Sequence, residues 1–117
     1  MKKTTIITAK ILAHYAELIE QGVKHYEVRS EPLDGADAIL LVSSETGKSL
    51  GMYEVRKTQC LTRDEDDRAM GLAKTTPEEF FSLFPKPCDG GPDRLWIAEL
   101  GNRTTLDSLV GLENEAR

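Results

Sequence analysis

The chain has 117 residues, of which 39% are hydrophobic and 30% are charged, and its formal net charge is −5. This length favours a single domain with its own core, and the composition excludes a disordered chain. No apolar run approaches the roughly 18 residues that a membrane-spanning helix needs, and the apolar stretch behind the basic start is too short for a signal peptide. We therefore expect a cytoplasmic protein with no membrane attachment.

The N-terminal third predicts a strand, a helix and a second strand. Residues 4–8 are β-branched and favour a strand. Apolar residues then recur at the spacing of one helix face, at Ile11, Leu12, Tyr15, Leu18 and Ile19. Gly22 stands where a glycine in the left-handed conformation would end that helix. Residues 25–29 alternate like a strand, so a very tight turn joins them to the helix.

The middle of the chain predicts a hairpin. Residues 38–42 form an apolar run that is typical of a buried strand, and residues 50–62 predict a long strand. The polar turn 43–49 joins them. Gly51, early in the long strand, indicates a bulge or a close approach of another group to the backbone.

The C-terminal half predicts helices and a last strand. Thr76, Pro77 and Glu79 have the spacing of a capping box with proline at the first helical position. The helix that they begin ends before Pro85. Residues 94–100 predict the last strand, and apolar positions at 106, 109 and 110 a short helix that closes an end. We expect one domain over residues 1–112 and a frayed tail over 113–117.

This order of elements predicts an α+β fold. Short-range hairpins with inserted helices fit a small, mostly antiparallel β-barrel with two to three flanking helices.

Metal and cofactor sites have little support. Cys60 and Cys88 are far apart, and His14 and His25 are equally unclustered, whereas a zinc site needs several ligands at close spacing. The acidic run 64–67 lacks the alternating ligands and central glycine of a calcium loop, and it is typical of a helix start. We expect no metal and no cofactor.

Positive charge is concentrated near the N-terminus. Residues 1–29 contain five Lys or Arg and three Glu, a local charge of +2, whereas residues 30–117 contain ten basic and seventeen acidic residues, a local charge of −7. This distribution argues against a large surface that follows nucleic-acid phosphates, but it allows a small positive patch.

That patch includes the alternating stretch after Gly22. On a regular strand, one face would carry Lys24, Tyr26 and Val28, and the other His25, Glu27 and Arg29. Ordinary surface ion pairs, worth roughly 0–1 kcal/mol each, would explain such a pattern. A binding site is the alternative, and it requires Lys24 to lie on the turn after Gly22 so that it can join Glu27 and Arg29.

The spacing of Gly22, Lys24, Glu27 and Arg29 resembles the signature of the ASCH superfamily, which is related to the PUA domain. The glycine-bearing strand at 49–55, the helix end at 80–85 and the late strand at 95–100 are also similar to this family. The likeness extends over residues 7–100. It implies a PUA-like β-barrel with a cleft that the motif residues line.

The resemblance implies binding of RNA or of a modified nucleoside or nucleotide in this cleft. Lys24 and Arg29 can hold a phosphate or a developing oxyanion, and Glu27 can accept hydrogen bonds from a nucleobase. The candidate ligand-binding residues are the motif side chains, a strand neighbour and a serine of the polar turn: Lys24, Tyr26, Glu27, Arg29 and Ser44.

A hydrolase is the alternative. It would act on the amide of a modified nucleoside, as an amidohydrolase, or on RNA, as a ribonuclease, with Lys24 and Glu27 as catalytic residues. The amidohydrolase branch of the family has a threonine nucleophile where this chain has Glu27, so that mechanism does not transfer. A protein-interaction domain ranks last, and the sequence gives no signal for an oligomeric state.

Overall fold

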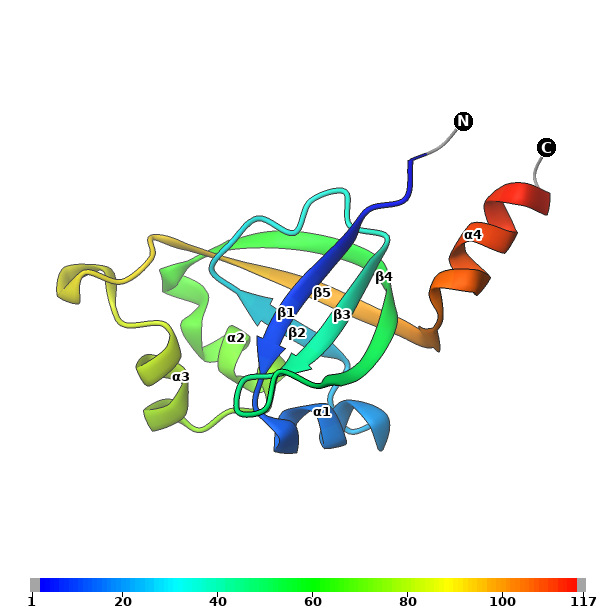
Figure 1. Cartoon of the computed structure of the whole chain (residues 1–117). Helices are drawn as coiled ribbons and strands as arrows, with labels where there is room; N and C mark the ends of the chain where they lie inside the picture. Colours follow the sequence, from blue (N-terminus) through cyan, green and yellow to red (C-terminus); the bar gives the residue numbers. More distant parts are fainter. Residues whose placement is uncertain (1–2, 116–117) are drawn as a thin grey trace.

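A computed structural model describes residues 3–115, except for the side chains of residues 110 and 112–115. It shows a curled five-stranded sheet accompanied by helices (Figure 1). The elements follow one another as β1 (Ile6–Ile11), α1 (Ala13–Glu20), β2 (Tyr26–Arg29), β3 (Ala38–Ser43), β4 (Ser49–Thr62), α2 (Asp66–Ala73), α3 (Pro77–Leu83), β5 (Arg94–Thr104) and α4 (Leu106–Glu115), with short 3₁₀ turns at Arg63–Glu65 and Pro87–Asp89. The α+β fold class is therefore confirmed.

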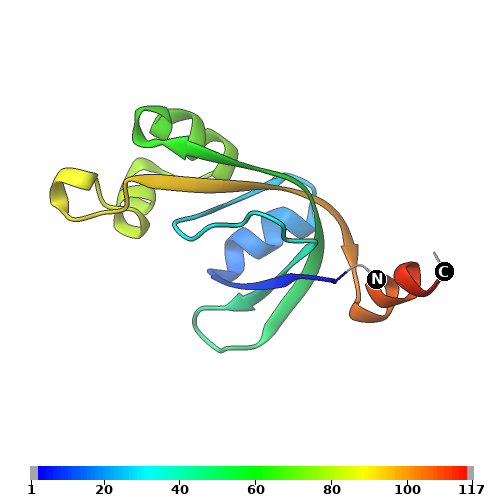
Figure 2. The same ribbon diagram turned by 90° about the horizontal axis from the view of Figure 1, so that it is seen from above.

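The sheet is an open half-barrel. Its strand order is β1-β3-β4-β5-β2, with β1 parallel to β3 and the other neighbours antiparallel. The long strands β4 and β5 change register between Tyr53 and Lys57, and Figure 2 shows the strong curvature that results. The edge strands β1 and β2 do not pair with each other, so the predicted small barrel is present in an open form.

The two faces of β5 belong to two different cores. Leu95 and Ile97 pack in a cluster with Phe80 of α3, whereas Ala98 and Leu100 pack in a cluster with α1. The alternation predicted from the sequence is thus present, and both of its faces are buried. The sheet therefore separates the α1 side of the molecule from the α2–α3 side.

The end of α1 fixes the position of Lys24. Gly22 has a φ of +76° and donates to the carbonyl of Ile19 at 3.1 Å, while Val23 donates to the carbonyl of Leu18 at 2.9 Å. These two bonds form a Schellman motif, as the sequence predicted for a terminal glycine. Because β2 begins only at Tyr26, Lys24 lies on the turn and is free of the strand alternation.

Two predicted strands were too short. β1 continues to Ile11, which the sequence assigned to the helix, because residues 6–11 all pair with β3. β5 continues to Thr104, because its last residues pair with the bent part of β4. Periodicity within a segment cannot reveal such pairing between distant segments.

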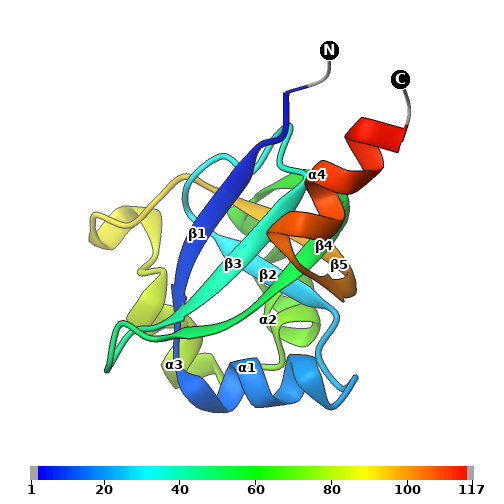
Figure 3. The same cartoon turned by 45° about the vertical axis from the view of Figure 1, so that its right-hand side comes forward.

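The C-terminal helix differs from its prediction. α4 extends away from the barrel instead of closing one of its ends (Figures 1 and 3), because β5 stays paired with the bent part of β4 as far as Thr104 and the helix begins only after it. The helix continues to Glu115, so it includes residues 113–115 of the segment predicted to fray, while residues 116–117 lie outside the described part.

Local signals elsewhere are confirmed. The Thr76 side chain accepts a hydrogen bond from the Glu79 amide at 3.2 Å, and Pro77 occupies the first turn of α3. The Glu79 carboxylate, however, does not complete the capping box, because it accepts a hydrogen bond from the hydroxyl of Tyr15 on α1. Gly51 has a φ of +122° beside a register shift, as predicted for a bulge.

Gly22 and Gly71 provide a matched pair of stability predictions. A Cβ at either position would meet no atom within 4 Å, but only Gly22 has positive φ. Gly22→Ala is expected to lower the free energy of unfolding by about 1 kcal/mol, because alanine is strained there. Gly71→Ala in α2 is expected to raise it by roughly 0.5–1 kcal/mol. Urea denaturation measures both, and a shift of the same sign would contradict the assignment of the turn.

Candidate binding cavity

A cavity of about 350 Å³ lies where the start of α1, the end of β1, β2 and the α2–α3 connection meet. Its walls are largely apolar and include Ile11, Leu12, Tyr15, Leu83 and Phe84. Its polar lining includes Lys24, Glu27, Arg29, Ser44 and Thr75. The structure thus brings together the three charged motif residues and Ser44 around one space.

Lys24 is buried at the base of the cavity, with 3% of its surface exposed. Its Nζ donates to the carbonyl of Ala73 at 2.7 Å and lies 5.5 Å from the centre of the Tyr15 ring. Nζ is also 3.9 Å from Oε1 of Glu27. Burial lowers the pKa of the Lys24 ammonium, and the Glu27 charge opposes this shift.

Glu27 lies between the two cations and is 5% exposed. Its second carboxylate oxygen is 3.6 Å from Nη1 of Arg29. Burial raises the pKa of the Glu27 carboxyl above its usual value, even though Lys24 and Arg29 act in the opposite direction. The pKa of Lys24 is therefore lowered and the pKa of Glu27 is raised. Opposite pKa shifts of two neighbouring groups are common at functional sites and also occur in structural ion pairs.

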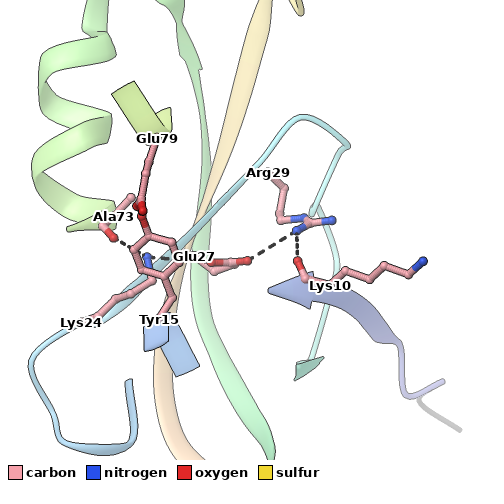
Figure 4. Close-up of polar contacts among 7 residues, drawn as sticks. All are labelled: Lys10, Tyr15, Lys24, Glu27, Arg29, Ala73 and Glu79. Atoms are coloured by element: carbon pink, nitrogen blue, oxygen red, sulfur yellow. Dashed lines mark hydrogen bonds and ion pairs between the residues drawn. The ribbon is translucent and has the colours of Figure 1, made fainter. Parts of the chain in front are cut away.

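Arg29 connects the two edges of the half-barrel. Its Nη1 on β2 donates to the carbonyl of Lys10 on β1 at 2.8 Å (Figure 4), and its Nε is 3.5 Å from the carboxylate of Glu31. Its side chain is 23% exposed, more than those of Lys24 and Glu27. Nη1 makes the hydrogen bond of this guanidinium group to the described residues and Nη2 makes none, so Arg29 presents further donors at the open end of the charged series.

Tyr15 forms one wall and links α1 to α3. It is 5% exposed, and its hydroxyl donates to Glu79 (Figure 4). The Glu79 carboxylate also lies 3.9 Å from Nε2 of His14. The α2–α3 segment is thereby attached to α1 on one side of the cavity and to Lys24 through Ala73 on the other.

Tyr26 does not line the cavity. It alternates with Glu27 along β2 and packs, partly buried, against the cluster that contains Val28 and Phe80. The sequence placed Tyr26 among the ligand-binding residues, and that role stays a prediction without support from its position.

Thr75 was missed by the sequence analysis. Its hydroxyl oxygen is buried and has no hydrogen-bond partner, and the residue lines the cavity. A buried hydroxyl without a partner costs about 1–3 kcal/mol, so a ligand that bonded to it would gain binding energy. The carbonyls of Lys10 and Ala73 were missed too, because any residue type supplies a carbonyl and the sequence holds no signal for them. The apolar spacing of Tyr15 predicted burial, but not its place beside Lys24.

The arrangement suits an anionic ligand with an apolar part. Lys24 and Arg29 carry two positive charges against the single carboxylate of Glu27, and Lys10 lies at the lining as well.

The described residues contain no cluster of three or more His, Cys, Asp or Glu that could hold a metal ion. No described helix is long and apolar enough to cross a membrane.

Comparison with known proteins identifies the fold. A scan against protein-family models finds no match, and a search of curated proteins finds no similar sequence. A solved structure of ASCH from Zymomonas mobilis superposes with a TM-score of 0.65 at 17% identity, over 94% of this chain and 80% of that one. The chain has an ASCH-like fold.

Two variants of the same Zymomonas mobilis protein agree with this result. The serine-to-alanine variant has a TM-score of 0.65 at 16% identity, and the tyrosine-to-phenylalanine variant a TM-score of 0.63 at 17% identity. Each covers 97% of this chain and 83% of the other. The likeness concerns the ASCH-like fold, and the roles of the cavity residues rest on their own geometry.

The raised pKa of Glu27 predicts a particular pH dependence of stability. A folded-state carboxyl with a raised pKa binds its proton more tightly than the unfolded chain does, so its contribution to stability is lost as pH rises. Relative to Glu27→Gln, the unfolding free energy of the wild type should fall from about pH 4.3 upward, by at most about 1.4 kcal/mol per pH unit.

Urea denaturation between about pH 4 and pH 7 measures this slope. Glu31→Gln, which removes an exposed carboxylate nearby, is the control and should show no such slope relative to the wild type. A wild type that gains stability with pH relative to Glu27→Gln would contradict the effect of burial on Glu27.

Proposed function

We propose that this chain binds RNA or a modified nucleotide, with one nucleotide held in the cavity. The observation that carries the proposal is the convergence of Lys24, Glu27 and Arg29 at a cavity of about 350 Å³. This volume falls at the lower end of the roughly 300–1,000 Å³ of small-molecule sites, which suits a ligand the size of a nucleotide.

The apolar wall supports a planar, partly apolar ligand. Leu12, Leu83 and Phe84 offer aliphatic and aromatic surface, and the Tyr15 ring lies beside Lys24. Proteins hold unstacked bases against such surfaces, and each aromatic contact contributes about 1–3 kcal/mol to binding.

The charged series supplies the polar contacts. The free donors of Arg29 at the open end match the geometry of a phosphate. Glu27 lies deeper and can accept hydrogen bonds from an amino group of the base, and the Thr75 hydroxyl can form one more bond. Lys24 already bonds to Ala73 and faces Glu27, so its main role is to hold Glu27 in place.

Arg29→Ala tests this proposal. Titration with nucleoside monophosphates and short single-stranded RNA at low and moderate salt should show affinity reduced roughly tenfold or more, because a charge-assisted hydrogen bond to phosphate is lost. Arg94→Ala removes an exposed arginine at the start of β5 that does not line the cavity, and it should leave the affinity unchanged.

Arg29→Lys keeps the positive charge but not the planar arrangement of donors, and it should give an intermediate affinity. This variant still tests the proposal if Arg29→Ala disrupts the contact between β1 and β2. A wild type that binds none of these ligands would refute the proposal, as would equal affinities in wild type and both Arg29 variants.

A hydrolase is the second candidate, favoured by the opposite pKa shifts of Lys24 and Glu27 at a separation of 3.9 Å. Glu27 would act as a general base toward water, and Lys24 would stabilise a developing oxyanion. The substrate would be an acylated cytidine or an RNA phosphodiester.

Incubation of the wild type with acylated cytidines and with RNA, without added metal, tests this activity. Lys24→Ala is expected to lower the rate at least a hundredfold, since the loss of one donor to a developing oxyanion costs about 10²–10³-fold. Equal rates in the wild type and in Lys24→Ala prepared identically would exclude this pair as catalysts.

A further inference from the structure

A second hollow lies at the other end of α1. It has a volume of about 450 Å³ and lies between the end of α1, the turn at Gly22 and the bent parts of β4 and β5. Its polar lining consists of Glu20, His25, Tyr53, Arg56, Asn102 and Arg103. His25 follows Lys24 directly in the turn after α1. Lys24 lines the cavity, and His25 lines the hollow.

Both arginines of the hollow lie against glycines. A Cβ at Gly101 would be 2.9 Å from Nε of Arg56, and a Cβ at Gly51 would be 3.2 Å from Cζ of Arg103. The absence of a side chain at these two positions lets each guanidinium group approach the backbone. Both arginines line the hollow.

The lining of the hollow carries two arginines and one carboxylate, that of Glu20. Arg56 makes no ion pair or hydrogen bond with any residue of the described chain. Arg103 pairs with Glu20 at 3.7 Å, but both side chains are more than half exposed, at 57% and 66%. Such exposed pairs contribute roughly 0–1 kcal/mol. An anion that binds Arg103 more tightly than Glu20 does can therefore displace the Glu20 carboxylate.

Tyr53 adds a polar group that has no protein partner. It is only 5% exposed and lines the hollow, and its hydroxyl forms no hydrogen bond with the described residues. The hydroxyl oxygen remains accessible to solvent, so a ligand in the hollow can reach it. A phosphate oxygen in the hollow would supply a hydrogen-bond partner while its charge meets Arg56 and Arg103.

We propose that this hollow is a second phosphate site, which contacts the backbone of the same RNA strand whose nucleotide occupies the cavity. The inference rests on the proposed RNA-binding function and extends it from a nucleotide to a strand. The eight residues of α1 separate the two sites by about 12 Å, a distance that a few nucleotides of single-stranded RNA span. Arginine forks bind phosphate without reading the base, so the hollow would contribute affinity and orientation.

The test compares three ligands: inorganic phosphate, a nucleoside monophosphate and a single-stranded RNA octamer. The double variant Arg56→Ala/Arg103→Ala is expected to bind the octamer about tenfold more weakly than the wild type, with a shallower salt dependence, and to bind the monophosphate equally well. The matched control Arg68→Ala/Arg94→Ala removes the same charge from α2 and the start of β5 and should bind all ligands like the wild type. Inorganic phosphate should shift the amide resonances of Gly101 and Asn102 in the wild type and not in the double variant.

The inference would be overturned if the double variant bound the octamer with wild-type affinity and salt dependence, while monophosphate binding stayed intact. An equal loss of octamer affinity in the control pair would also overturn it, because net charge would then explain the effect. If the wild type bound neither monophosphate nor octamer, the proposed function itself would fail, and the amide shifts with inorganic phosphate would report separately on the hollow.

Discussion

The buried pair of Lys24 and Glu27, continued by the half-buried Arg29, joins the elements that surround the cavity. Charges removed from water need close partners, and loss of one partner from a buried pair typically costs about 3–5 kcal/mol. Here the partners extend beyond the series itself, to the carbonyl of Ala73 at the end of α2 and the carbonyl of Lys10 on β1. The charged series thus holds the α2–α3 segment and both edges of the sheet in place around the cavity.

The open barrel and the cavity have the same origin. β1 and β2 form the two edges of the curled sheet, and between them a single side chain, Arg29, reaches from one strand to the backbone of the other. If hydrogen bonds joined β1 to β2 along their length, no room for a ligand would remain between these two strands. The gap instead exposes part of Arg29 above the buried Lys24 and Glu27, so a structural link and a proposed ligand contact share one residue.

Features set by local chemistry were predicted from the sequence. Gly22 ends α1 and Thr76 begins α3, because caps depend on a few neighbouring residues. The motif spacing led to the three charges, and the requirement that Lys24 lie on the turn is met. Features set by pairing between distant segments were not predicted: the parallel β1–β3 pair, the added length of β5 and the projection of α4. Thr75 and the two carbonyls of the site were missed because nothing in their residue types distinguishes them.

The central claim is that Lys24, Glu27 and Arg29 form the polar end of a nucleotide site. A crystal structure of the chain bound to a short single-stranded RNA tests it most directly. We expect one base to lie against Tyr15 and Phe84 in the cavity, with a phosphate oxygen within hydrogen-bond distance of the Arg29 guanidinium. RNA bound at another surface, with the cavity empty and Arg29 bonded only to Lys10, Glu27 and Glu31, would contradict it.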